Sequence, residues 1–127
     1  MALAKRVKRG GSYYQGYELI VSAGVGDYIL DIVQPDASNI NSISVTPDEY
    51  GAGDKFNLSH LDTDENVVAL LAKDIYNQGG NVATMFDFPA LEDMQPGEIL
   101  RLTYTSDAGG ALNIHAIVEY IGIMRKS

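Results

Sequence analysis

The sequence predicts a single, mainly β domain folded as an antiparallel, jelly-roll-like β-sandwich. Its 127 residues suit one domain, and 46% of them are hydrophobic, as in folded proteins. Short apolar or alternating segments recur roughly every 10–15 residues, which is typical of a sandwich or barrel rather than of alternating strands and helices. Turn-forming sequences rich in glycine, such as residues 22–27 and 106–110, separate these segments.

The first half of the chain predicts four strands. The first covers residues 17–21, where Tyr17, Leu19 and Val21 share one face. Residues 28–33 are nearly all apolar, which predicts a central strand. Residues 40–46 and 55–61 alternate, so their apolar positions are expected to face the core. These positions are Ile43, Val45, Phe56 and Leu58.

Residues 62–78 fit either a helix or a strand. A helix would begin with a capping box formed by Asp62 and Glu65 and would end at the glycine pair that follows residue 78. Its apolar face would consist of Val67, Val68, Leu71 and Ile75. The alternative is a long buried strand through the same apolar residues. We expect one short helix near residues 64–78.

The last third of the chain has the clearest pattern. Residues 85–88 predict a short strand before Pro89, and residues 99–105 and 112–123 predict two longer ones. The turn at 106–110 is expected to join the two longer strands as a β-hairpin. The residues expected to face the core are Leu100, Leu102, Tyr104, Ile114, Ala116 and Val118.

Charge divides the chain into three parts. Residues 1–16 are expected to form a basic extended arm, 17–124 the sandwich, and 125–127 a short basic tail. The net charge is −8, but residues 12–124 contain three basic side chains and all 17 acidic ones. An acidic body repels nucleic acid and anionic membranes, so we expect neither as a partner. No apolar stretch follows the basic start, so no secretion signal is expected.

We expect no enzyme activity and no cofactor or metal. The residues from Asp62 begin like a calcium loop, but Val67 stands where the loop needs glycine and Lys73 where it needs glutamate. A looser cation site using Asp54, Asp62 or Asp64 is less favoured than a solvated turn.

Nucleophilic and metal chemistry also lack their usual patterns. The only histidines are His60 and His115, and neither has a metal-ligand partner at a suitable spacing. No nucleophile motif and no phosphate-binding glycine loop is present. The chain contains no cysteine.

The candidate interface combines the basic arm with its tyrosines. Three roles for the arm are considered: a solubilising tail, a docking arm and a nucleic-acid-binding segment. Four basic charges would bind nucleic acid only weakly. Tyrosines among the charges favour a docking arm. The candidate residues are Lys5, Arg6, Lys8, Arg9, Tyr13 and Tyr14.

Four segments resemble small β-sandwich structural proteins of tailed-phage virions, and the resemblance extends over most of residues 17–121. They are Tyr28-Ile-Leu-Asp-Ile-Val, Ile43-Ser-Val-Thr-Pro-Asp-Glu-Tyr-Gly, Gly53-Asp-Lys-Phe-Asn-Leu-Ser-His and Gly97-Glu-Ile-Leu-Arg-Leu-Thr-Tyr-Thr. The resemblance implies a non-catalytic decoration (cement) protein that binds the outer capsid lattice through its sandwich and arm. It implies the major capsid protein or another virion protein as partner, and a location in the virion, assembled in the host cytoplasm. A homo-oligomer is expected, with a trimer favoured.

Three other functions are alternatives. A head–tail or tail accessory protein would occupy another position in the same particle. A carbohydrate-binding sandwich would use a platform of exposed aromatic residues, for which Tyr13, Tyr14, Tyr17 and Tyr50 are the candidates. A cellular adaptor domain is the third alternative.

Overall fold

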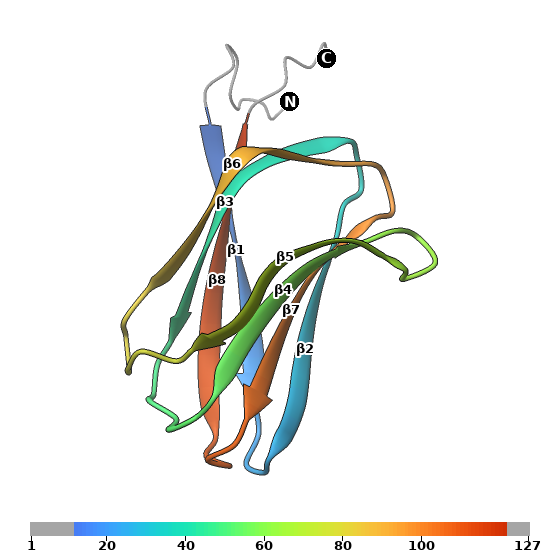
Figure 1. Cartoon of the computed structure of the whole chain (residues 1–127). Coiled ribbons are helices and arrows are strands. Elements are labelled where there is room, and N and C mark those ends of the chain that lie inside the picture. Colours follow the sequence, from blue (N-terminus) through green and yellow to red (C-terminus); the bar gives the residue numbers. More distant parts are fainter. Residues whose placement is uncertain (1–11, 122–127) are drawn as a thin grey trace.

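The structure, a computed structural model, describes residues 12–121 (Figure 1). This part of the chain forms two four-stranded antiparallel sheets and contains no helix, so none that could span a membrane. The predicted β-sandwich is therefore confirmed. The strands are β1 (Ser12–Val21), β2 (Gly26–Val33), β3 (Ser38–Pro47), β4 (Lys55–Leu61), β5 (Val67–Tyr76), β6 (Thr84–Met94), β7 (Ile99–Ser106) and β8 (Leu112–Ile121).

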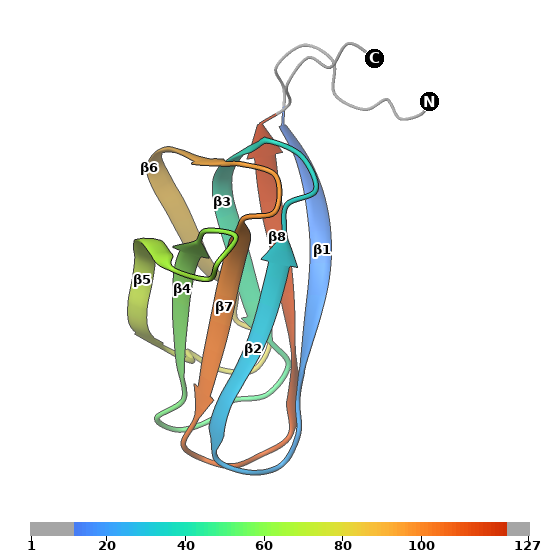
Figure 2. The same ribbon diagram turned by 90° about the vertical axis from the view of Figure 1, so that its right-hand side faces the viewer.

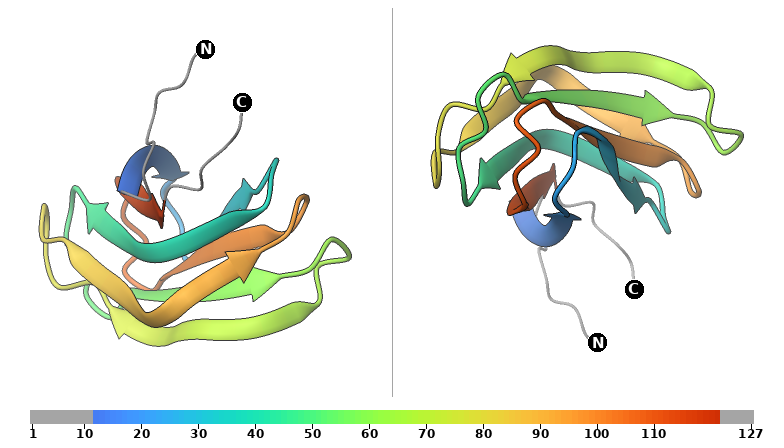
Figure 3. Two further views of the ribbon diagram at one scale, coloured as in Figure 1. Left: turned by 90° about the horizontal axis from the view of Figure 1, so that it is seen from above. Right: turned by 90° about the horizontal axis from the view of Figure 1, so that it is seen from below.

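The chain alternates between the two sheets. One sheet, called the β1 sheet here, has the strand order β1-β8-β3-β6, and the β2 sheet has the order β2-β7-β4-β5. The β2 sheet faces the viewer in Figure 2. Only the β4–β5 connection stays within one sheet, and the others described cross between sheets. This interleaving is that of a double-sheet jelly roll, whose two layers are seen from the ends in Figure 3.

The core fills the space between the two inner faces, because alternate residues of each strand point inward. The core positions predicted on strands 40–46 and 55–61 are confirmed, since all four side chains are 0% exposed. The six predicted on the last two strands are also 0% exposed and are confirmed. These six are Leu100, Leu102, Tyr104, Ile114, Ala116 and Val118.

The expected β-hairpin between the last two strands is wrong. Strand β7 pairs with β2 and β4, whereas β8 pairs with β1 and β3 in the other sheet. The turn at 106–110 therefore crosses between layers. Both sheets of a sandwich bury one face in the same core, so alternation identifies the inward residues without identifying the paired strands.

The expected helix near residues 64–78 is also wrong, because residues 67–76 form strand β5. Asp62 closes a turn instead of starting a helix. Its Oδ1 accepts hydrogen bonds from the backbone N–H groups of Asp64 (2.9 Å) and Asn66 (2.8 Å). Glu65 has a positive φ of 65°, which turns the chain back alongside β4. The β-branched residues that follow favour an extended chain.

Three strand assignments need smaller corrections. Strand β1 begins at Ser12, so the end of the predicted arm at residue 16 falls inside a paired strand. Strand β2 lies at a sheet edge and is not central, and its Ile29 and Val33 are 48% and 55% exposed. Strand β6 continues past Pro89 to Met94. Proline is tolerated there because β6 is an edge strand, whose outward N–H groups need no partner strand.

Candidate protein-binding surfaces

The predicted interface residues divide into three groups. Lys5, Arg6, Lys8 and Arg9 lie outside the described residues. Tyr13 points inward, where it packs against the core and stacks on Tyr120 with ring centroids 5.2 Å apart. Tyr14 points outward from the same strand, is 65% exposed, and donates a hydrogen bond to Glu119 at 3.3 Å. Neighbouring residues of a strand face opposite sides, so only one of the two tyrosines is on the outer surface.

The acidic residues considered for a cation site lie apart. Asp54 is the last residue of the β3–β4 connection, whereas Asp62 and Asp64 lie in the β4–β5 connection at the other end of the sandwich. Hydrogen bonding from the backbone N–H of Asn66 lowers the pKa of Asp62, as expected for a carboxylate that stabilises a turn. Within residues 12–121, no cluster of three or more suitable side chains is arranged to hold a metal ion.

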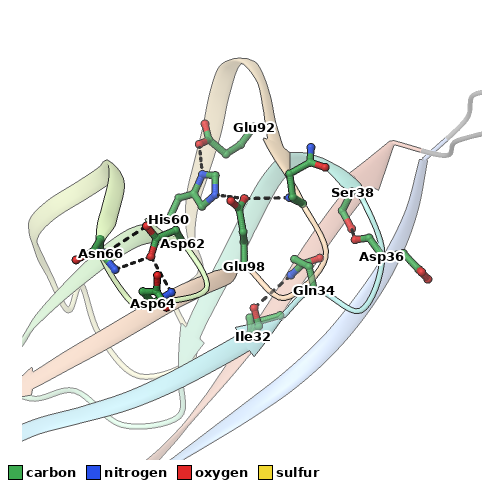
Figure 4. Close-up of polar contacts among 11 residues, drawn as sticks. Ile32, Gln34, Asp36, Ser38, His60, Asp62, Asp64, Asn66, Glu92 and Glu98 are labelled. Atoms are coloured by element: carbon green, nitrogen blue, oxygen red, sulfur yellow. Dashed lines mark hydrogen bonds and ion pairs between the residues drawn. The ribbon is translucent and has the colours of Figure 1, made fainter.

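His60 connects the two sheets, an arrangement that sequence reasoning missed (Figure 4). It lies on β4 of the β2 sheet, and only 3% of its side chain is exposed. Its Nδ1 is 2.6 Å from Glu92 Oε2 on β6 of the β1 sheet. Its Nε2 is 2.8 Å from Glu98 Oε1, which also accepts a hydrogen bond from the Gln95 N–H. The three side chains therefore link strand β4 of one sheet to edge strand β6 of the other and to the β6–β7 connection.

Burial and hydrogen bonding shift the pKa of His60 in opposite directions. Burial alone would lower the pKa of His60, but the hydrogen bonds to Glu92 and Glu98 outweigh it and raise the pKa above 6.5. The backbone N–H of Gln95 and the ring of His60 lower the pKa of Glu98. A protonated ring can donate to both glutamates, so folding favours the protonated form of His60 more than in a free histidine.

Replacing His60 by glutamine is expected to remove a pH-dependent part of the stability. Because the pKa of His60 is raised on folding, its contribution is complete below pH 6.5 and is lost as the pH rises through the folded pKa. Thermal denaturation should show the largest difference in Tm between wild type and His60→Gln near about pH 6, shrinking toward about pH 9. The control is His115→Gln, which changes the exposed histidine. A His60→Gln difference that is constant across this range would contradict the assignment.

The end of the sandwich that holds this cluster is strongly acidic. The β2–β3, β4–β5 and β6–β7 connections meet there, and they contain no lysine or arginine. The first residue of β1 pairs with the last residue of β8 at the same end. The basic sequence that precedes β1 therefore joins the chain at this end. The acidic residues are Asp36, Asp62, Asp64, Glu65, Glu92, Asp93 and Glu98.

Strand β5 forms an exposed apolar surface at the edge of the β2 sheet. Val67, Val68, Leu70 and Tyr76 are 64%, 55%, 56% and 56% exposed, and we call these four residues the β5 surface. An exposed apolar edge strand favours association with another protein surface. The sequence pattern gave no sign of it, because the same residues were assigned to the buried face of a helix or to a buried strand.

No protein-family profile and no curated protein matches the chain. Solved structures with a similar fold include a serine protease of Aeromonas sobria, with a TM-score of 0.52 and 11% identity over 96% of this chain and 28% of the protease. A capsid chain of cyanophage Pam1 has a TM-score of 0.46 and 13% identity over 95% of this chain and 93% of its own length. The family 32 carbohydrate-binding module of Clostridium perfringens NanJ, in complex with galactose, has a TM-score of 0.45 and 12% identity over 80% of this chain and 93% of the module.

The similarity to the protease, whose TM-score is above 0.5, shows the sandwich fold alone. The chain spans less than a third of the protease, and 32% of a similar chain from infectious bursal disease virus.

Proposed function

We propose that this chain is a non-catalytic structural protein of a virus particle, a decoration protein that binds the major capsid protein or another virion protein. The observation that carries the proposal is the topology β1-β8-β3-β6 over β2-β7-β4-β5. A double-sheet jelly roll of eight strands recurs in viral capsid and lectin domains. Because fold does not determine function, the surface must decide between these two classes.

The surface favours protein binding over sugar binding. The four tyrosines considered as a sugar platform do not share a face: Tyr13 and Tyr17 pack against the core, and Tyr14 points outward. Tyr50 lies in the β3–β4 connection, at the other end of the sandwich from Tyr14. The β5 surface is instead mostly aliphatic, so it lacks a platform of aromatic rings, and an exposed apolar patch of this kind suits a protein contact.

The buried titratable groups favour a structural role over catalysis. His60 bonds two glutamates across the sheets. The carboxylate of Asp54 bonds the Tyr104 hydroxyl and two backbone N–H groups. Groups that are buried and fully engaged in this way hold strands and connections in place. We therefore assign the chain to assembly within the virion, as a homo-oligomer, without a nucleic-acid or membrane partner.

Deleting residues 1–11 is expected to leave the sandwich folded but to weaken its attachment to particles. A deletion to residue 16 would remove the first half of β1, so the cut is placed before Ser12. Changing Lys5, Arg6, Lys8 and Arg9 to glutamine should weaken attachment by about tenfold or more and flatten its salt dependence, as loss of steering charges does. The measurement is co-sedimentation of the chain with particles from the cells that make it, at several salt concentrations.

The matched control compares two variants that each remove two charges: Lys8 and Arg9 to glutamine in the arm, and Arg125 and Lys126 to glutamine in the tail. Attachment that is lost equally in the tail variant and in the arm variant would reflect net charge alone. A chain that sediments as a free small protein under all conditions would refute the virion assignment.

A further inference from the structure

The β5 surface has opposite charge at its two ends. The acidic residues Asp64 and Glu65 precede the apolar residues Val67, Val68 and Leu70, and Lys73 follows them. Lys73 is exposed. Asp74, also exposed, comes next in the sequence. On β4, Lys55 pairs with Tyr76, and its Nζ lies 6.0 Å from the centre of the Tyr76 ring.

This charge distribution restricts what can cover the surface. The described residues contain only three basic side chains, and all of them are on the β2 sheet. Arg101 is already engaged, since it donates to both carboxylate oxygens of Asp31 and to Glu65. Lys55 and Lys73 therefore provide the positive end of the β5 surface. A suitable partner must offer an apolar centre, an acidic end opposite the lysines and a basic end opposite Glu65.

We propose that a second copy of this chain covers the β5 surface, related by a two-fold axis near Ala69. A two-fold interface brings the same patch of both copies together in opposite directions. Because Ala69 is midway between Glu65 and Lys73 in the sequence, this arrangement sets Lys73 of each copy against the partner's Glu65. The Glu65 side chain already accepts a hydrogen bond from Arg101 of its own chain, but it is 60% exposed and has room for a second cation. The apolar residues of the two copies then cover one another.

The contact is made through side chains rather than by adding a strand to the sheet. Pairing between β5 and β4 is interrupted at three points, and Asp74 has a positive φ of 54°. Its N–H donates to Asn57 Oδ1 at 3.0 Å, within the same sheet. Such bulges twist an edge strand away from regular pairing with another chain, while the side chains stay exposed. The proposed dimer does not depend on whether the chain is part of a virus particle.

Sedimentation of the purified chain across a range of concentrations tests the proposal. We expect a reversible dimer of twice 13.7 kDa. Val68→Asp should weaken dimerisation by about tenfold or more, as removal of a central apolar contact does. The control is Val33→Asp, because Val33 has the same 55% exposure and lies at the opposite edge of the same sheet. A monomer at all concentrations, a trimer, or equal effects of both variants would overturn the proposal.

Charge exchange tests the two-fold arrangement itself. Lys73→Glu alone places like charges at both contacts of the dimer, and so does Glu65→Lys alone, so each should dimerise poorly. When the two variants are mixed, both contacts regain opposite charges, and a heterodimer should form. Native mass spectrometry with one variant ¹⁵N-labelled distinguishes it from either homodimer. Failure of the folded variants to form the heterodimer would exclude this arrangement.

Discussion

Val118→Asp is expected to unfold the domain. Val118 lies on β8 with 0% of its side chain exposed, packed between the two sheets. The substitution removes an apolar side chain from the core, which costs about 2 kcal/mol, and places a carboxylate where nothing can pair with it. The total cost of several kcal/mol approaches the stability of a small domain, which is about 5–15 kcal/mol.

The neighbouring residue provides a matched control. Ile117 is also a β-branched aliphatic residue, but it points outward and is 45% exposed. Ile117→Asp should therefore change the free energy of unfolding by about 1 kcal/mol or less. Leu102→Asp and Thr103→Asp repeat the comparison on β7, where Leu102 is buried and Thr103 faces outward. Chemical denaturation measures each difference, and a cooperatively folded Val118→Asp variant with wild-type stability would show that its position in the core is misassigned.

The alternation of residues predicted which side chains are buried but not which strands pair. In the last two strands every residue expected in the core is there, because a period of two is a local property of an extended chain. Their partners are distant in sequence: Leu102 lies opposite Leu30 and Leu58, and Val118 lies opposite Gln15 and Ile43. A short turn with glycines fits a hairpin and a crossing between sheets equally well.

Residues 62–78 show why the same pattern can give the wrong element. The spacing of Val67, Val68, Leu71 and Ile75 fits one face of a helix, and Asp62 and Glu65 have the spacing of a capping box. In the structure Asp62 forms a turn, and the bulges of β5 break the strict alternation by which a strand is recognised. Pairing with β4 in the folded chain makes residues 67–76 a strand rather than a helix.

The two glutamates that contact His60 are distant from it in the sequence, so no local sequence pattern predicts that they meet. Glu92 and Glu98 are 32 and 38 residues from His60 in the sequence. The exposure of β5 follows from its position at a sheet edge, which is a property of the topology.

Asp54 holds together the end of the sandwich opposite the acidic end. Its side chain is 1% exposed. Oδ1 accepts hydrogen bonds from the N–H groups of Asp107 (2.6 Å) and Ala108 (2.9 Å), and Oδ2 accepts one from the Tyr104 hydroxyl. That hydroxyl in turn accepts a hydrogen bond from Asn77 at 3.0 Å. The β3–β4, β5–β6 and β7–β8 connections thus meet at one buried carboxylate.

Asp54→Ala is expected to lower the free energy of unfolding by about 3–5 kcal/mol, because three donors lose their acceptor at once and one of them, the Tyr104 hydroxyl, is fully buried. Asp54→Asn should cost less, since the amide oxygen still accepts from the backbone of the β7–β8 connection. The control is Asp107→Ala, which removes an exposed carboxylate of the same connection and leaves its backbone N–H in place. Urea denaturation of the three variants should rank them Asp54→Ala, Asp54→Asn and Asp107→Ala in order of decreasing loss. Equal losses for Asp54→Ala and Asp107→Ala would mean that solvent satisfies these donors as well as the buried carboxylate does.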